Sequence, residues 1–180
     1  MKKILSLLLF VVTFACFSVS AQETKDTAKK PMLSASEDEV VKFIGAFPEF
    51  LKENKDFNPS DAGSVAAAMT TIAANREKWE TFAKDNGFAS YENFLKVTTA
   101  VTTAYAYQLL QHNSAQLEKQ IASLPTTAQT LAKSQMKPVR EQISQYSKMI
   151  TPETLEVVKN HTDELNKIFI PAEKPKPKKK

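Results

Sequence analysis

Glycine is scarce in this chain, and the scarcity constrains the fold more than any other sequence feature. Gly45, Gly63 and Gly87 are the only three glycines in 180 residues. Folds that need many glycine turns, such as β-sandwiches, are therefore disfavoured, and so are glycine-rich phosphate loops. The chain also lacks an alternating apolar run long enough to predict a strand. We therefore expect an all-α protein.

The first two predicted helices follow clear start signals. Ser36 and Glu39 form a capping box for a helix that runs to about residue 54, and Pro48 should kink or restart this helix. A second start at residues 58–61 begins a helix that extends to residue 86. Gly87 then ends it, because glycine accepts the left-handed conformation that closes a helix.

The rest of the body predicts three more helices. Ser90 caps a long third helix, which we expect to bend or break near residues 112–114 before Pro125 ends it. A fourth helix starts at residue 126 or 127, runs to about residue 150 and should kink near Pro138. Thr151, followed by proline and glutamate, starts a fifth helix that continues to residue 169.

These elements predict a single-domain bundle of about five helices, some kinked at proline, at residues 34–170. Its size suits one domain with a core of its own. Residues 22–33 are polar and irregular and are expected to form a flexible lead-in. Residues 171–180 are rich in lysine and proline and are expected to form a disordered tail.

Residues 1–21 resemble a cleavable bacterial secretory signal. Lys2 and Lys3 precede an apolar stretch from Ile4 to Val19, and the small residues Val19-Ser20-Ala21 end it. The stretch is shorter than the roughly 20 apolar residues that span a bilayer, so we expect no transmembrane span in the mature chain. The chain is therefore predicted to be exported, to the periplasm or the medium. Lipid attachment at Cys16 is a minor alternative, because only Ala15 of the preceding residues fits that motif.

The sequence offers little for catalysis or cofactor binding. Cys16 is the only cysteine and lies inside the signal, so the mature chain has no thiol. His112 and His161 are the only histidines, and neither stands in a metal-binding motif, so we expect no metal. We expect no haem or other cofactor, since no Cys-x-x-Cys-His motif occurs, and no hydrolase motif indicates an enzyme. Residues 31–170 hold 14 Lys and Arg against 17 Asp and Glu, which also disfavours nucleic-acid binding.

A short internal repeat has two interpretations. Residues 97–100 and 101–104 both read Val-Thr-Thr-Ala, and residues 65–74 form a second tract of small side chains. The simpler interpretation is that two helices with small faces pack closely. The alternative is a groove for an apolar ligand, formed by Ala100, Ala104, Tyr105 and Tyr107.

The C-terminal tail suggests a class of partner. Its lysines are separated by prolines that keep the segment extended, and they are Lys174, Lys176, Lys178, Lys179 and Lys180. Such a tail could contact anionic envelope lipid or cell-wall polymer, or it could serve only as a solubilising end.

Together these features favour an exported, non-enzymatic helical protein with a binding or structural role at the bacterial cell envelope. The alternative function is a carrier of a small apolar ligand or lipid, held between the helices rich in alanine and threonine. The sequence leaves the specific partner and the oligomeric state open.

Overall fold

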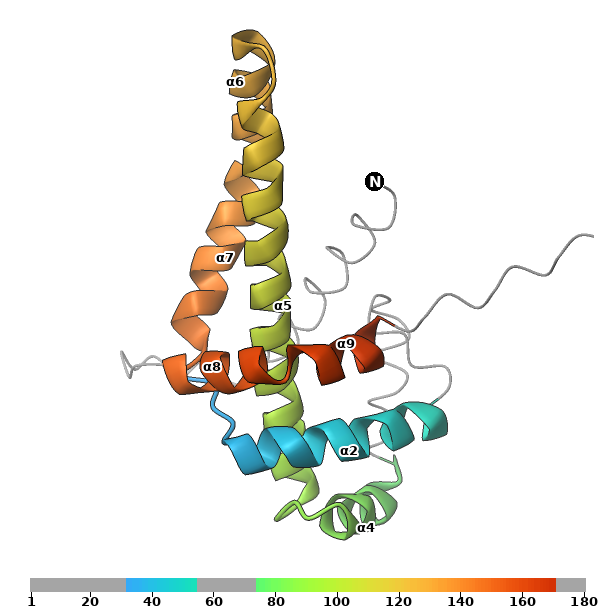
Figure 1. Cartoon of the computed structure of the whole chain (residues 1–180). Coiled ribbons are helices and arrows are strands. Elements are labelled where there is room, and N and C mark those ends of the chain that lie inside the picture. Colours follow the sequence, from blue (N-terminus) through green and yellow to red (C-terminus); the bar gives the residue numbers. More distant parts are fainter. Residues whose placement is uncertain (1–31, 55–73, 171–180) are drawn as a thin grey trace, which may run out of the picture.

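The computed structural model describes residues 32–54 and 74–170, and these residues are mostly helical (Figure 1). In chain order the helices are α2 (Glu37–Glu53), α4 (Arg76–Asp85), α5 (Tyr91–Ala122), α6 (Thr126–Gln135), α7 (Lys137–Met149), α8 (Pro152–Asn160) and α9 (Thr162–Phe169). Leu33 and Ile150 form an isolated parallel β-bridge. The all-α prediction is confirmed, but the described residues form seven helices rather than about five. None of the described helices is long and apolar enough to cross a membrane.

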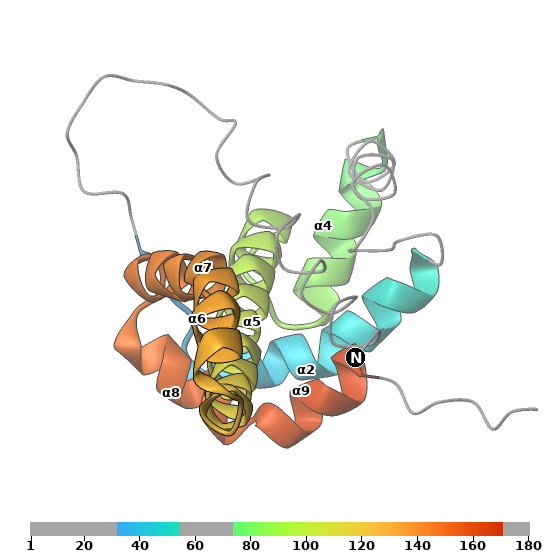
Figure 2. The same cartoon turned by 90° about the horizontal axis from the view of Figure 1, so that it is seen from above.

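Helix α5 is the central element and connects two regions. It packs against α2, α4, α6, α7 and α8. We call the first region the base, which consists of α2, α4, α8, α9 and residues 91–110 of α5. We call the second region the arm, residues 119–140, which comprises the end of α5, all of α6 and the start of α7. Figure 1 shows the arm extending beyond the base, and Figure 2 shows α6 and α7 beside α5, set apart from α4.

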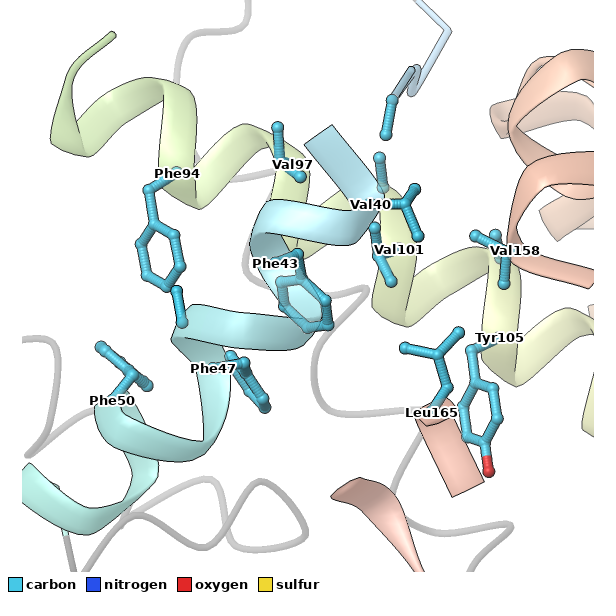
Figure 3. Close-up of a cluster of buried hydrophobic side chains, with 14 of the residues drawn as sticks. Val40, Phe43, Phe47, Phe50, Phe94, Val97, Val101, Tyr105, Val158 and Leu165 are labelled. Atoms are coloured by element: carbon cyan, nitrogen blue, oxygen red, sulfur yellow. The ribbon is translucent and has the colours of Figure 1, made fainter. Parts of the chain in front are cut away.

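The base is held together by an aromatic core (Figure 3). Helix α2 contributes Phe43, Phe47 and Phe50 from one face, because their spacing of four and three residues places them along one side of a helix. The rings of Phe43 and Phe47 stack at 4.6 Å between centroids. Phe94 of α5 is fully buried, and its ring lies 5.6 Å from Phe50 and 5.1 Å from Phe88. Such ring pairs add to the free energy gained from burying the apolar area.

The helix ends of the base follow the sequence signals. The Ser36 hydroxyl accepts the Glu39 N–H, and the Glu39 carboxylate accepts the Ser36 N–H at 2.9 Å, so the predicted capping box is present. Gly87 has a φ of 79°, in the left-handed region. The next residue, Phe88, donates its N–H to the carbonyl of Ala83 at 2.9 Å and buries its ring. Gly87 thus ends α4 as predicted and turns the chain into the core.

The predicted break at residues 112–114 is wrong, because α5 runs unbroken from Tyr91 to Ala122. Ser114 is buried, and α7 packs along α5, so tertiary contacts support the helix there. The predicted fourth helix instead divides into α6 and α7 at Met136. Pro138, two residues later, has no N–H to donate to the carbonyl of Ser134, which weakens the helix at the point where a kink was expected.

The predicted fifth helix also divides, into α8 and α9 at His161, where the backbone has φ −103° and ψ 19°. Helix α8 packs on both α5 and α2, and α9 packs on α2. Thr151 caps α8 as predicted. Helix α2 continues through Pro48 as one element. The predicted start of the second helix, residues 58–61, lies outside the described residues.

Thr154 fastens the segment before α2 to the start of α8. Its side chain is fully buried, and its hydroxyl accepts the N–H of Ala35 at 2.9 Å and lies 3.2 Å from the Ala35 carbonyl. Two backbone bonds of the bridge lie beside it: Leu33 N–H to Met149 O at 2.6 Å and Thr151 N–H to Leu33 O at 3.0 Å. The chain segments before α2 and after α7 are therefore joined by main-chain and side-chain hydrogen bonds.

Candidate functional site

A groove of about 880 Å³ lies where the base meets α7. It follows one side of α5 from Tyr105 to Glu118, with Ile143 of α7 and residues of α8 and α9 opposite. The side chains that line it are Tyr105, Gln108, Leu109, Gln111, His112, Ser114, Ala115, Glu118, Ile143, Lys159, Thr162 and Asn166. This lining is mixed, with amides and hydroxyls beside a few aliphatic groups.

Tyr105 lies at the end of the groove nearest the core. Burial raises the pKa of its phenol to about 12, so the phenol is neutral over the physiological range. Its O–H donates to Oδ1 of Asn166 at 2.7 Å, and its ring stacks on Phe169 at 4.9 Å. Tyr105 therefore joins α5 to α9 and is poorly placed to transfer a proton.

Gln108 makes a second connection between the helices beside the groove. Its Nε2 donates to the carbonyl of Leu155 at 2.8 Å, and its Oε1 accepts from the hydroxyl of Thr162 at 3.3 Å. Because these polar atoms already bond across the helices, they hold the groove in shape. A ligand there would bind through contacts additional to these bonds.

The two histidines make separate side-chain contacts, one within α5 and one between distant parts of the chain. Nε2 of His112 lies 2.7 Å from Nε2 of Gln116 on the same helix. Nε2 of His161 lies 2.7 Å from Oε1 of Glu37. Within the described parts of the chain, no group of three His, Cys, Asp or Glu residues gathers where it could hold a metal ion.

The residues of the sequence-predicted groove lie in different surroundings. Ala100 and Ala104 are completely buried in the core of the base. Tyr105 lines the groove described above, while Tyr107 is partly buried and its hydroxyl accepts from Nε2 of Gln111 at 2.6 Å. Of the four, Tyr105 thus faces the groove, and the two alanines fill the space between packed helices.

The arm is a second candidate site, and its surface differs from that of the groove. Among its residues, Ile121 and Met136 are buried, and neither belongs to the main core cluster. Nearly all the other arm side chains are exposed, including Leu124 at 41% and Leu131 at 64%. Both leucines are therefore open to contact with a partner, at the end of the molecule away from the core of the base.

All the charged side chains of the arm are positive. Residues 119–140 contain no Asp or Glu, and they contain four cationic residues, Lys119, Lys133, Lys137 and Arg140. In the remaining described residues the acids outnumber Lys and Arg by 15 to 9. Arg140 pairs with Glu118 at 2.9 Å, where α5 meets α7. Lys119 and Lys133 form no ion pair with any residue in the described ranges, so their charges are available to a partner.

Sequence reasoning missed both Thr154 and the arm. Thr154 stands three residues after the cap residue Thr151, in the first turn of the predicted helix. Nothing in this local pattern indicated that its hydroxyl bonds a residue far away in the sequence. The lack of acids across residues 119–140 is visible in the sequence, but their exposure is not. The predicted tail contacts, Lys174 to Lys180, lie outside the described residues.

No protein-family model, no curated protein and no solved structure matches this chain, so its function must be inferred from its own residues.

Proposed function

We propose that this chain is an exported, non-enzymatic binding protein of the bacterial cell envelope, and that the arm is its binding surface. The observation that supports this proposal is the presence of exposed leucines and of two lysines without an ion pair among the described residues, Lys119 and Lys133, in a segment that has no acid of its own. The base supplies the stability, because it holds the aromatic core. The arm has few buried side chains, so its exposed residues contribute little to folding and are free to recognise a partner.

Export is supported by residues 1–21, which the sequence predicts to be a secretory signal. A non-enzymatic role is supported by the groove, where Tyr105 and Gln108 are engaged in bonds between helices. These groups act as structural connections rather than as a nucleophile with an adjacent base.

The test compares an arm variant with a matched base variant in retention on isolated cell envelopes. The arm variant combines Lys119→Gln, Lys133→Gln, Lys137→Gln, Leu124→Ser and Leu131→Ser. The base variant makes the same kinds of change at exposed positions of the base and at Ile170, which follows α9, namely Lys52→Gln, Lys84→Gln, Lys167→Gln, Val41→Ser and Ile170→Ser. We expect the arm variant to lose retention and the base variant to keep it. Equal retention of both variants would contradict the proposal.

The groove supports a second candidate, a carrier of a small apolar ligand or lipid. Its volume of about 880 Å³ lies in the range of ligand pockets. Ala115 lines the groove, so Ala115→Trp should fill it and lower binding of a fluorescent fatty acid. Ala89→Trp, at an exposed position that belongs neither to the groove nor to the arm, is the matched control. A wild-type chain that binds no such probe would exclude this candidate.

A further inference from the structure

The turn at the end of the arm is held by hydrogen bonds of its own. Nε2 of Gln129 donates to the carbonyl of Leu124 at 2.8 Å and lies 3.3 Å from the carbonyl of Ala122. The hydroxyl of Ser123 donates to the carbonyl of Gln120 at 2.6 Å. The Gln129 side chain thus bonds the carbonyl of Ala122, the last residue of α5, and the Ser123 hydroxyl supplements the bond that its own N–H makes to Gln120. The turn therefore has a defined shape without burying Leu124.

One of the two exposed leucines lies in this turn, and the other lies on the helix that follows it. Leu124 stands directly before Pro125, and Leu131 is on α6, a helix with no buried residue. Between them the chain carries only small or neutral polar side chains, Pro125 to Thr130. No charge in this segment opposes entry into a less polar medium.

Along the chain, the lysines of the arm flank the segment that holds the two leucines. Lys119 lies near the end of α5, Lys133 lies near the end of α6, and Lys137 begins α7. Lys137 and Arg140 pair with Glu141 and Glu118, which flank the arm, whereas Lys119 and Lys133 have no ion pair among the described residues. The arm and these two acids together keep a net positive charge, so the arm attracts an anionic partner, whereas the more acidic base repels it.

A bilayer with anionic headgroups fits both features at once. A polyanion such as a nucleic acid or a wall polymer would pair with the lysines but would gain nothing from Leu124 and Leu131. The arm also lacks the aromatic side chains that stack on bases. A lipid surface accepts leucines at the boundary between headgroups and acyl chains and attracts lysines to its headgroups.

We propose that the arm docks on an anionic lipid bilayer, with Leu124 and Leu131 entering the interface and Lys119, Lys133 and Lys137 lying against the headgroups. This inference rests on the proposed function, because it names the partner of the same surface. The contact is peripheral, and lysines and leucines act together as two weak signals that are sufficient only in combination.

The first experiment measures binding of the chain without residues 1–21 to vesicles of phosphatidylglycerol and phosphatidylcholine, and to vesicles of phosphatidylcholine alone. We expect binding to the anionic vesicles to be at least about tenfold tighter and to fall with added salt. The arm variant should lose at least about tenfold of that affinity, whereas the base variant should keep it. Equal affinity of the arm variant and the wild type would overturn the inference.

A second measurement locates the contact. Leu131→Trp places an indole at the exposed position of the arm, and its emission should move to shorter wavelength when anionic vesicles are added. Trp79 is buried in the base and gives a constant background. Val41→Trp, an exposed position on α2 of the base, is the control and should not shift. A shift at position 41 without one at position 131 would place the membrane contact on the base and contradict the inference.

The lysine tail is tested separately by deleting residues 171–180. If this deletion abolishes vesicle binding and the arm variant does not, the tail is the lipid contact and the inference is wrong. The envelope assay distinguishes this failure from failure of the proposed function. Loss of envelope retention in the arm variant, together with unchanged vesicle binding, would leave the arm as a binding surface for a partner other than lipid.

Discussion

The base and the arm use the same kind of element, the α-helix, but in opposite ways. In the base, aromatic side chains from α2, α4, α5 and α9 meet in a continuous core, and many side chains of these helices are buried. In the arm, two buried residues, Ile121 and Met136, lie among exposed neighbours. The comparison teaches that secondary structure does not indicate where stability resides. Helices can be regular and still contribute little to the free energy of folding when few of their side chains are buried.

The largest expected difference between the regions comes from removing a core ring. Phe94→Ala removes a fully buried side chain that contacts several other rings, and it should lower the free energy of unfolding by about 3 to 5 kcal/mol. Leu131→Ala, in the arm, should change it by less than about 0.5 kcal/mol. Urea titration followed by circular dichroism measures both values. A large effect of Leu131→Ala would contradict the division into a stabilising base and an exposed arm.

A smaller loss of stability is expected when Ile121, one of the two buried residues of the arm, is shortened. Ile121→Ala should cost about 2 to 3 kcal/mol, near the lower end for such changes, because the exposed surroundings can close around the space. The loss should be local. Hydrogen exchange should speed up for the amides of residues 119–140 while those of α2 keep their protection. Equal acceleration in α2 would show that arm and base unfold as one unit.

Replacing the buried hydroxyl of Thr154 tests the connection between the chain segments of the base. Thr154→Val keeps the side-chain shape but leaves the N–H and carbonyl of Ala35 without this partner, which should cost about 1 to 3 kcal/mol. Thr130→Val is the matched control, since the hydroxyl of Thr130 bonds its own helix on the exposed arm. Thermal unfolding of the two variants gives the comparison. A control that loses as much stability as Thr154→Val would contradict the special role of the buried hydroxyl.

The smallest expected effect is electrostatic. Burial acts to raise the pKa of Glu39, but hydrogen bonds from Ser36 and Asn93 and the charge of Lys96 outweigh it and lower the pKa below its ordinary value of 4.5. The stabilisation from the ionised carboxylate is thus present above that value and is lost as the pH falls through the lower, folded-state pKa. Glu39→Gln should cost about 0.3 to 1 kcal/mol at pH 7. The difference from the wild type should disappear in acid, and a difference that is independent of pH would contradict this account.

The sequence predicted local features of the fold better than long-range ones. The capping box at Ser36, the left-handed Gly87 and the cap at Thr151 depend on residues next to one another, so their signals are complete in the sequence. The continuity of α5 through Ser114 depends on packing against α7, which no local pattern encodes. The break at His161 also lacked a glycine or proline signal, and the packing of α8 and α9 on α5 and α2 is not encoded in a local pattern.

The candidate site could be predicted only in part for the same reason. Tyr105 was named as a groove residue, and it does line a groove, but Ala100 and Ala104 lie in the packed core beside it. Spacing along a helix shows which residues share a face. It does not show whether that face meets another helix or solvent. The arm was missed because its exposure depends on how far α5 extends beyond the base.

The uninterrupted course of α5 has a geometric consequence. From Ala104 in the core to Ala122 at the end of the helix, 18 residues at about 1.5 Å each make a strut of roughly 27 Å. A straight helix of this kind resists compression and bending, and α7 braces it along one side. The far end of the arm is therefore kept at a nearly constant distance from the aromatic core, and a partner bound there would be separated from the base by the length of this helix.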